Sequence, residues 1–232
     1  MRIISSLAFL FVLCFGAFVN YAQGTLPFAG EIMEIHQRKD TVWDASKPSI
    51  LFTGSSSIRL WKDLQQRFPE NQILNTGFGG SQTSDLANFL NELILDYSPE
   101  KVFIYEGDND IIAKKRPKHI IGTFSSVLDT LQGKNPDMEI VLISAKPSIS
   151  RWKFKSKYKR LNKKLKDPAL QRKNVSYVDV WSVMLNKRRL KKDLFIEDGL
   201  HMNSKGYDIW EEALKDFVTL KKWNFTETYW LF

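Results

Sequence analysis

The amino-acid sequence predicts an α/β fold, a three-layer α/β/α sandwich around a five-stranded parallel sheet. Short apolar runs alternate along the chain with longer segments of helical periodicity. Continuous apolar strands separated by helices are typical of a parallel sheet that is covered on both faces. Glycine and polar residues follow directly after several of the apolar runs. Because open parallel sheets place their ligand sites beyond the carboxyl ends of the strands, these residues are candidates for a functional site.

Each predicted element follows from a local pattern. The first is an amphipathic helix at residues 28–40, indicated by the spacing of Phe28, Ile32 and Ile35. The apolar runs predict strands at residues 49–53, 72–75, 101–105, 139–143 and 175–180. The remaining helices are predicted at residues 58–68, 83–97, 117–132, 153–166 and 204–220. The sequence contains no internal repeat, low-complexity tract or linker, so a single domain is predicted over residues 24–232.

The first 23 residues have the layout of a secretory signal peptide. Arg2 is followed by an almost unbroken apolar run over residues 7–19 and then by small and polar residues. This pattern predicts export, to the periplasm or the medium, after cleavage. An uncleaved membrane anchor is the alternative, and the shortness of the apolar run disfavours it. Lipid attachment at Cys14 is disfavoured because Leu13 stands where a lipidation signal requires a small residue.

Composition narrows the class of protein. The 232 residues are 43% hydrophobic and 26% charged, which is the balance of a folded globular domain with one core. Cys14 is the only cysteine and lies in the predicted signal peptide. The exported chain would therefore hold no disulfide framework, no thiol nucleophile and no cysteine-bound metal.

The chain carries a formal net charge of +8, and much of the excess lies in residues 151–173 and 187–192. Nucleic-acid binding would require a recognisable module or aromatic platforms among the basic residues, and it is not predicted. A solvated helical face is the favoured interpretation of the basic stretches. Weak electrostatic attraction to an anionic envelope surface or glycan stays open.

The first candidate cluster for chemistry is the run of serines at residues 55–57, which follows Gly54 at the end of the first predicted strand. A serine on a tight strand-to-helix turn presents its hydroxyl outward, and the helix start offers N–H groups to an anion. Taken alone, the run fits a helix N-cap better, because serine is a preferred capping residue.

Two further clusters follow the second and third predicted strands. Residues 75–81 are glycine-rich and partly resemble a dinucleotide-binding loop, but Gln82 occupies the third glycine position, and a plain turn is the alternative. In residues 106–111, Asn109 can supply a neutral N–H donor where an oxyanion forms. The acidic residues around it could suggest a metal, but no histidine lies nearby and no EF-hand spacing is present.

The fourth cluster is an Asp-x-x-His sequence before the last predicted helix. Asp198 precedes His201 by three residues, and a carboxylate at this spacing can orient an imidazole and stabilise its cation. His36 and His119 fall inside predicted helices and are interpreted as surface or packing residues.

The ordered series of serine, glycine, asparagine and Asp-x-x-His resembles the SGNH, or GDSL-like, hydrolases, and the glycine-rich loop is similar to that of platelet-activating-factor acetylhydrolase-like members. The resemblance implies a flavodoxin-like fold and a serine esterase. It implies Ser56 as nucleophile, with Asp198 and His201 completing a catalytic triad. It also implies an oxyanion hole formed by Ser56, Gly80 and Asn109.

The sequence departs from the family pattern at two positions. Ser55 replaces the aspartate of the usual Gly-Asp-Ser, so the choice of Ser56 among three serines rests on alignment alone. Asp108 stands where a second glycine is common. The serine turn is also unlike the G-x-S-x-G elbow of α/β-hydrolases, because Ile58 occupies the position of its last glycine.

The predicted reaction is hydrolysis of a small ester, with a short acyl group such as acetyl removed from a carbohydrate or glycan. A lipid-directed acylhydrolase or lysophospholipase is one alternative. A non-catalytic envelope- or glycan-binding relative on the same scaffold is another, because fold alone does not fix function. The expected mechanism needs no metal and no organic cofactor, and the sequence does not indicate an oligomeric state.

Overall fold

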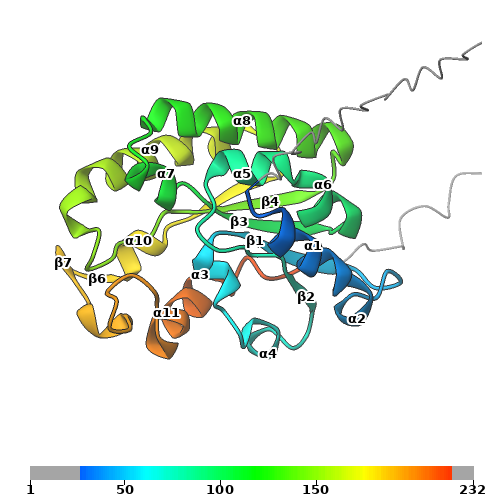
Figure 1. The fold of residues 1–232 in the computed structure, drawn as a ribbon, viewed down its shortest axis with the longest axis horizontal. Helices are drawn as coiled ribbons and strands as arrows, with labels where there is room; N and C mark the ends of the chain where they lie inside the picture. Colours follow the sequence, from blue (N-terminus) through cyan, green and yellow to red (C-terminus); the bar gives the residue numbers. More distant parts are fainter. Residues whose placement is uncertain (1–26, 221–232) are drawn as a thin grey trace, which may run out of the picture.

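The protein is an α/β sandwich built on one main sheet, and the computed structural model describes residues 27–220 of it (Figure 1). The predicted signal peptide lies outside the described residues. Five parallel strands form the main sheet in the order β2-β1-β3-β4-β5. Their bounds are β1 Ser49–Gly54, β2 Gln72–Asn75, β3 Lys101–Tyr105, β4 Glu139–Ile143 and β5 Val175–Val178. The predicted fold class and parallel five-stranded sheet are confirmed.

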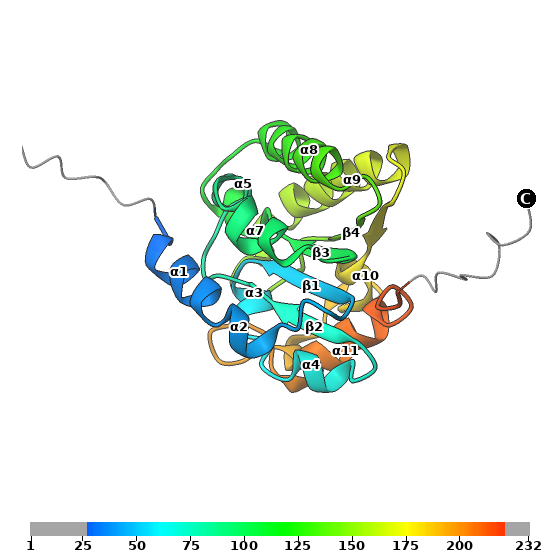
Figure 2. The ribbon, with the colours of Figure 1, turned by 90° about the vertical axis from the view of Figure 1, so that its right-hand side faces the viewer.

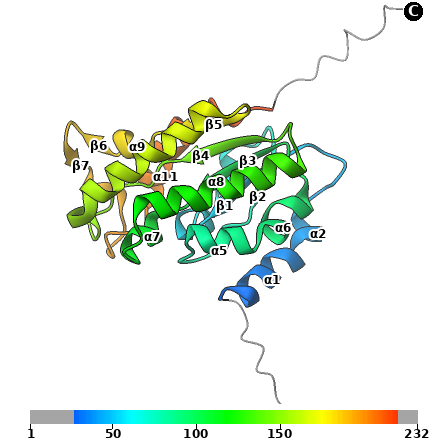
Figure 3. The same cartoon turned by 90° about the horizontal axis from the view of Figure 1, so that it is seen from above.

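Helices cover both faces of this sheet (Figures 1 and 2). One face carries α1 Ala29–Gln37, α5 Thr83–Asn88, α6 Leu90–Leu93, α8 Pro117–Lys134 and α9 Lys155–Gln171. The other face carries α3 Ser56–Arg59, α4 Leu64–Arg67, α10 Val180–Val183 and α11 Ser204–Leu214. The shorter elements are α2 Lys39–Val42, α7 Asp108–Ile112 and the antiparallel pair β6 Leu185–Asn186 and β7 Arg189–Leu190. Viewed from above, α8 and α9 lie side by side across the sheet (Figure 3).

Two hydrophobic layers hold the sandwich together, one on each face of the sheet. Phe124 of α8 and Leu161 of α9 are fully buried in the first layer. Trp210 of α11 is fully buried in the second layer, where the rings of Phe52 and Phe103 stack with centroids 4.3 Å apart. Burying one such side chain contributes about 1.5–3 kcal/mol, so these layers supply most of the stabilisation of the fold. Among residues 27–220, no helix combines the length and apolarity needed to cross a membrane.

Several predicted elements are shorter in the structure. The helix predicted at residues 58–68 is broken into α3 and α4, because the Asn75 amide takes up the carbonyl groups of Ile58, at 2.8 Å, and Trp61, at 3.4 Å. The last strand ends at Val178 instead of residue 180, because Asp179 caps α10 by accepting a 3.0 Å hydrogen bond from Ser182 N.

The other differences concern where helices end and which short elements were not predicted. The helix predicted at residues 83–97 is divided into α5, α6 and the 3-10 turn Leu95–Tyr97, and the helix predicted at residues 204–220 ends at Leu214. The short helix α7 and the β6–β7 pair were not predicted. The main strands keep their predicted positions. The polar clusters that follow them therefore meet at the carboxyl ends of the strands, on the left in Figure 1.

Candidate active site

The serine turn at the end of β1 exposes one of its three serines. Gly54 has a φ of +123°, and a Cβ at this position would lie 2.0 Å from Tyr105 O, so only glycine fits. Ser55 N donates to Tyr105 O at 3.0 Å, which fixes the turn against β3. The side chains of Ser55 and Ser57 are buried, whereas Ser56, the first residue of α3, is partly exposed.

The Asp-x-x-His turn forms a compact hydrogen-bonded unit. Asp198 Oδ1 accepts from Leu200 N at 2.8 Å and from His201 N at 2.9 Å, and Asp198 Oδ2 lies 2.5 Å from His201 Nδ1. Partial burial alone would raise the pKa of Asp198, but these hydrogen bonds lower it to about 2. The carboxylate therefore stays charged and holds the Nδ1–H tautomer of the ring, which leaves Nε2 free to accept a proton.

Ser56 and His201 meet although 145 residues separate them in the sequence. The Ser56 hydroxyl lies 3.0 Å from His201 Nε2, within hydrogen-bond distance. Serine, imidazole and carboxylate thus form one continuous chain of hydrogen bonds. This is the arrangement in which an imidazole can act as general base toward a serine hydroxyl.

The glycine-rich loop after β2 lies against the serine turn. Phe78 N donates to Gly54 O at 2.8 Å, and a Cβ at Gly77 would lie 2.4 Å from Arg59 N, so the loop packs closely on α3. Gly80 follows with a φ of +77°. Within residues 27–220, neither Ser56 N–H nor Gly80 N–H donates to a protein group. Both N–H groups are available to a ligand.

Asn109 is held from both ends of its amide. Its Nδ2 donates to Ser81 O at 2.8 Å, and its Oδ1 accepts a 3.0 Å hydrogen bond from Arg151 Nη2. Gly107, with a φ of +94°, precedes α7 and sets the position of Asn109 in its first turn. An amide NH₂ has two hydrogens, and one of them remains for a further acceptor.

Buried charged side chains support the part of the site around Asn109. Asp108 accepts hydrogen bonds from Arg151 Nη1 and Tyr158 at Oδ1, and from Tyr105 at Oδ2. Burial opposes ionisation, but the charges of Lys146 and Arg151 lower the pKa of Asp108. Asp108 therefore has a structural role in place of the glycine that is common at its position.

Lys146 ties this buried cluster to the histidine turn. The side chain is fully buried, and Nζ donates to Leu200 O at 2.6 Å, one residue before His201. Burial lowers the pKa of Lys146 to about 8, and the charges of Asp108 and Asp198 oppose that shift. Sequence reasoning missed Lys146 and treated Arg151 as part of a solvated basic stretch, because neither lies in a recognisable motif.

A second buried acid lies behind Asn109. Glu106 is fully buried, and its Oε1 shares a 2.5 Å hydrogen bond with Ser81 Oγ. Burial raises the pKa of Glu106 well above its usual range, which favours the neutral carboxylic acid. Because Ser81 O accepts from the Asn109 amide, Glu106 supports the same loop. In the sequence, Glu106 stands in the acidic cluster of residues 106–111, and nothing in that pattern indicates this role.

The other two histidines lie apart from the site. His36 Nε2 lies 3.1 Å from Asp96 Oδ2 on the exposed side of α1, and His119 lies in the first turn of α8. In the part of the chain that the structure describes, no group of three or more His, Cys, Asp or Glu side chains is placed to hold a metal ion.

A sequence profile of the GDSL-like lipase/acylhydrolase family matches residues 45–209, a span that includes every candidate site residue. The chain belongs to the GDSL-like lipase/acylhydrolase family. It is accordingly a carboxylic-ester hydrolase, as the SGNH-type resemblance of its motifs implies.

Solved structures share the fold of this GDSL-like acylhydrolase. A Streptococcus pneumoniae protein described as a platelet activating factor is 24% identical, with a TM-score of 0.73 over 82% of this chain and 92% of that one. A GDSL-like lipase from Bacteroides thetaiotaomicron is 20% identical, with a TM-score of 0.66 over 78% of this chain and 96% of that one. At these identities the likeness concerns the fold alone.

A curated relative adds a sequence match. N-acylneuraminate cytidylyltransferase of Escherichia coli is 25% identical to the acylhydrolase over 180 residues, which are 75% of this chain. The match covers 41% of the relative, so the chain spans less than half the length of that protein.

Proposed function

We propose that this acylhydrolase is a serine esterase in which Ser56 is the nucleophile, His201 the general base and Asp198 the group that orients the imidazole. The observation that carries the proposal is the 3.0 Å contact between Ser56 Oγ and His201 Nε2, continued to Asp198 at 2.5 Å. In the first step His201 takes the Ser56 proton as the oxygen attacks the ester carbonyl, and then protonates the leaving alcohol. In the second step His201 activates water, which releases the acid and regenerates Ser56.

The developing oxyanion would be bound by Ser56 N–H, Gly80 N–H and the free Asn109 Nδ2 hydrogen. Two features support this assignment: the backbone donors have no acceptor among the described residues, and Asn109 is fixed at both ends of its amide. Removing one such donor costs about 10²–10³ in turnover in other serine hydrolases. Asn109→Ala should therefore fold normally and lose activity by about that factor.

The decisive experiment compares Ser56→Ala with its two neighbours as matched controls. Hydrolysis of p-nitrophenyl acetate should fall at least about 10³-fold in Ser56→Ala. Ser55→Ala and Ser57→Ala should keep most of the activity, because both side chains are buried and neither contacts His201. A fluorophosphonate should label the wild-type chain and not Ser56→Ala. Equal hydrolysis or labelling in all three variants would contradict the assignment of Ser56, and no labelling of the wild type would favour a binding-only relative.

For the substrate we infer a short acyl ester, such as acetyl, on a carbohydrate or glycan. Two names among the matched proteins support this: a solved structural neighbour with a TM-score of 0.60 is an acetyl esterase with acetate, and the curated relative is named for an N-acylated sugar. A series of p-nitrophenyl esters of increasing chain length tests the acyl group. Activity should be highest on acetate, and a maximum on long chains would instead favour the lipid-directed alternative.

Export is part of the same proposal. The cationic start and apolar run of residues 1–23 support cleavage before residue 24, with the enzyme released to the periplasm or the medium. N-terminal sequencing of the protein purified from its producing cells tests this. A sequence beginning at Met1 would contradict cleavage.

A further inference from the structure

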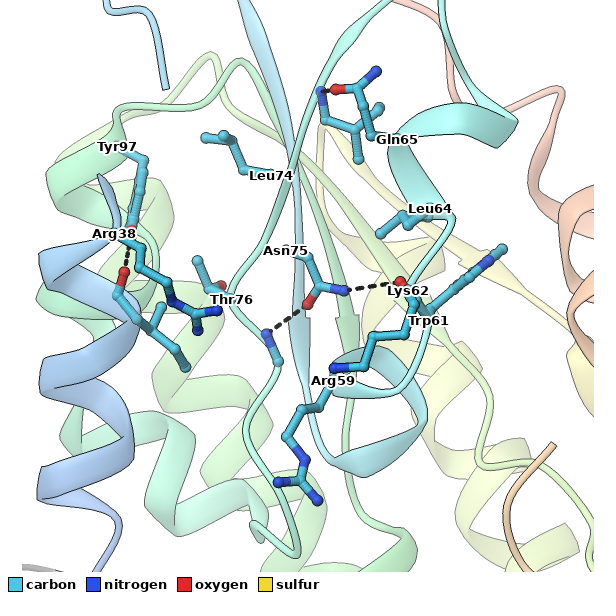
Figure 4. Close-up of a pocket in the computed structure, with 13 residues that line it drawn as sticks. Arg38, Arg59, Trp61, Lys62, Leu64, Gln65, Leu74, Asn75, Thr76 and Tyr97 are labelled. Atoms are coloured by element: carbon cyan, nitrogen blue, oxygen red, sulfur yellow. Dashed lines mark hydrogen bonds between the residues drawn. The ribbon is translucent and has the colours of Figure 1, made fainter. Parts of the chain in front are cut away.

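A hollow of about 450 Å³ lies beside β2, the edge strand of the sheet (Figure 4). It is bordered on one side by α1 and the C-cap residue Arg38 that follows it, and on the other side by the α3–α4 segment. Trp61, Leu64 and Leu74 form apolar walls, and the polar wall includes Asn75. We call this hollow the edge groove. Its volume lies in the range of small-ligand sites.

Cations line the edge groove. Arg38, Arg59 and Lys62 all contribute to it and are exposed, and none of its lining residues is acidic. Arg59 contacts Glu31 at 3.4 Å, whereas Arg38 Nε donates only to the backbone oxygen of Glu34. Among the side chains that the structure describes, no carboxylate forms an ion pair with Arg38 or Lys62. The groove therefore offers positive charge that an anionic ligand can neutralise.

The edge groove adjoins the candidate oxyanion loop. Arg59 follows Ser56 by three residues, and its guanidinium lies directly over Gly79, where a Cβ would be 2.7 Å from Arg59 Cζ. Gly79 N donates to both oxygens of Glu31 at 3.2 Å, so Arg59 and Glu31 together hold the residue next to Gly80. Arg59 therefore connects the groove to Gly79, the residue that precedes the proposed oxyanion donor Gly80 in the sequence.

We propose that the edge groove is a substrate subsite that binds a negatively charged sugar residue next to the acylated one, so that the substrate is an acylated anionic glycan. This inference rests on the proposed esterase function and narrows its substrate class. Arginine and lysine supply charge-assisted hydrogen bonds to carboxylate or sulfate groups, and the apolar walls can pack against the faces of sugar rings. The basic face of α9 lies near β5, the opposite edge strand of the sheet, and serves as the control surface for charge.

Binding is measured by calorimetry with the chain carrying Ser56→Ala, so that no ester is turned over. The probes are an oligogalacturonate for carboxylate, a heparin-derived oligosaccharide for sulfate and a xylo-oligosaccharide as the neutral sugar. We expect an anionic probe to bind more tightly than the neutral one. Arg38→Gln with Lys62→Gln should weaken that binding about five- to tenfold, as expected for loss of two exposed charge contacts. The anionic probe whose binding is weakened more shows whether the groove prefers carboxylate or sulfate.

The matched control is Lys163→Gln with Lys164→Gln, which removes the same charge from the exposed face of α9. It should leave binding of both anionic probes unchanged. We call the Arg38→Gln, Lys62→Gln variant the groove pair and the Lys163→Gln, Lys164→Gln variant the α9 pair. An equal loss of binding in the two pairs would show attraction to net charge alone and overturn the proposal. Unchanged binding in the groove pair, or equal binding of neutral and anionic probes by the unsubstituted groove, would overturn it as well.

Hydrolysis of p-nitrophenyl acetate separates the two proposals, because this ester carries no anionic sugar for the groove to bind. With Ser56 intact, the groove pair should hydrolyse it at the wild-type rate. On an acetylated oligogalacturonate the groove pair should raise KM about five- to tenfold and leave kcat unchanged. If hydrolysis of p-nitrophenyl acetate does not depend on Ser56, the esterase mechanism fails, whereas the calorimetric result still decides whether the groove binds anions.

Discussion

Arg151 holds Asn109 by the oxygen of its amide, through a 3.0 Å hydrogen bond from Nη2 to Oδ1. The same guanidinium binds Asp108 through Nη1, so one planar group fixes two consecutive residues of α7. Because the amide oxygen accepts from Arg151, the Asn109 NH₂ group faces Ser81 O. We infer that Arg151 is a positioning residue for Asn109, the proposed oxyanion donor.

The substitution Arg151→Lys tests this role. Lysine keeps a positive charge beside the buried Asp108, but it lacks the planar fork whose two nitrogens bind Asp108 and Asn109 separately. We expect kcat on p-nitrophenyl acetate to fall about tenfold, with KM little changed, because the loss concerns the transition state. Thermal unfolding checks that the variant is folded.

A double-mutant cycle with Asn109→Ala provides the control. If Arg151 acts through Asn109, then Arg151→Lys should have little further effect on kcat once the amide is gone. An equal tenfold loss in the Asn109→Ala background would show that Arg151 acts through another group.

On the acid side of the pH profile, the loss of kcat/KM should result from the uptake of a single proton. The pKa of Asp198 is lowered to about 2, so this carboxylate stays charged well below neutral pH. A general base accepts a proton only in its unprotonated form, so activity should be lost at low pH. The logarithm of kcat/KM should therefore decline with a slope of about one per pH unit. A slope of about two between neutral pH and pH 4 would mean that a second group, such as Asp198, titrates in that range.

Most of the main sheet could be anticipated from local patterns in the sequence, whereas the pairing of Ser56 with His201 was implied only by the family resemblance. The strands are continuous apolar runs, and Ser56, Asp198 and His201 stand in short motifs. Their catalytic roles remain predictions, and the structure adds that Ser56 is the one serine of the three that contacts His201.

The supporting residues could not be anticipated, because their roles depend on contacts between distant segments. Arg151 lies in a basic stretch, and only the packing of α9 and its preceding turn against α7 turns it toward Asn109. Lys146 lies beyond β4 and reaches the histidine turn only in the folded chain. The break between α3 and α4 likewise depends on the Asn75 amide of a neighbouring strand.

Glu106 should behave as a neutral acid. Burial raises its pKa well above the usual 4.5, so its contribution to stability is complete below that pH and is lost as the pH rises through the raised value. Glu106→Gln is neutral at every pH, so its free energy of unfolding should rise relative to that of the wild type between pH 5 and pH 8. Glu106→Ala should cost about 1–3 kcal/mol, because Ser81 loses its buried partner. Urea unfolding at pH 5 and pH 8 measures both. If the difference in free energy of unfolding between Glu106→Gln and the wild type were the same at the two pH values, the pKa of Glu106 would not be raised.

Gly54 and Gly122 should respond in opposite ways to alanine. At Gly54 the φ of +123° and the 2.0 Å approach of a Cβ to Tyr105 O would force β1 and β3 apart, so Gly54→Ala should cost more than about 3 kcal/mol and remove activity. At Gly122, inside α8, a Cβ meets nothing within 4 Å, and Gly122→Ala should stabilise the protein by about 0.5–1 kcal/mol. Urea unfolding gives both values. If the two variants were equally stable, β1 would have room to shift, and the serine turn would not depend on a glycine at its first position.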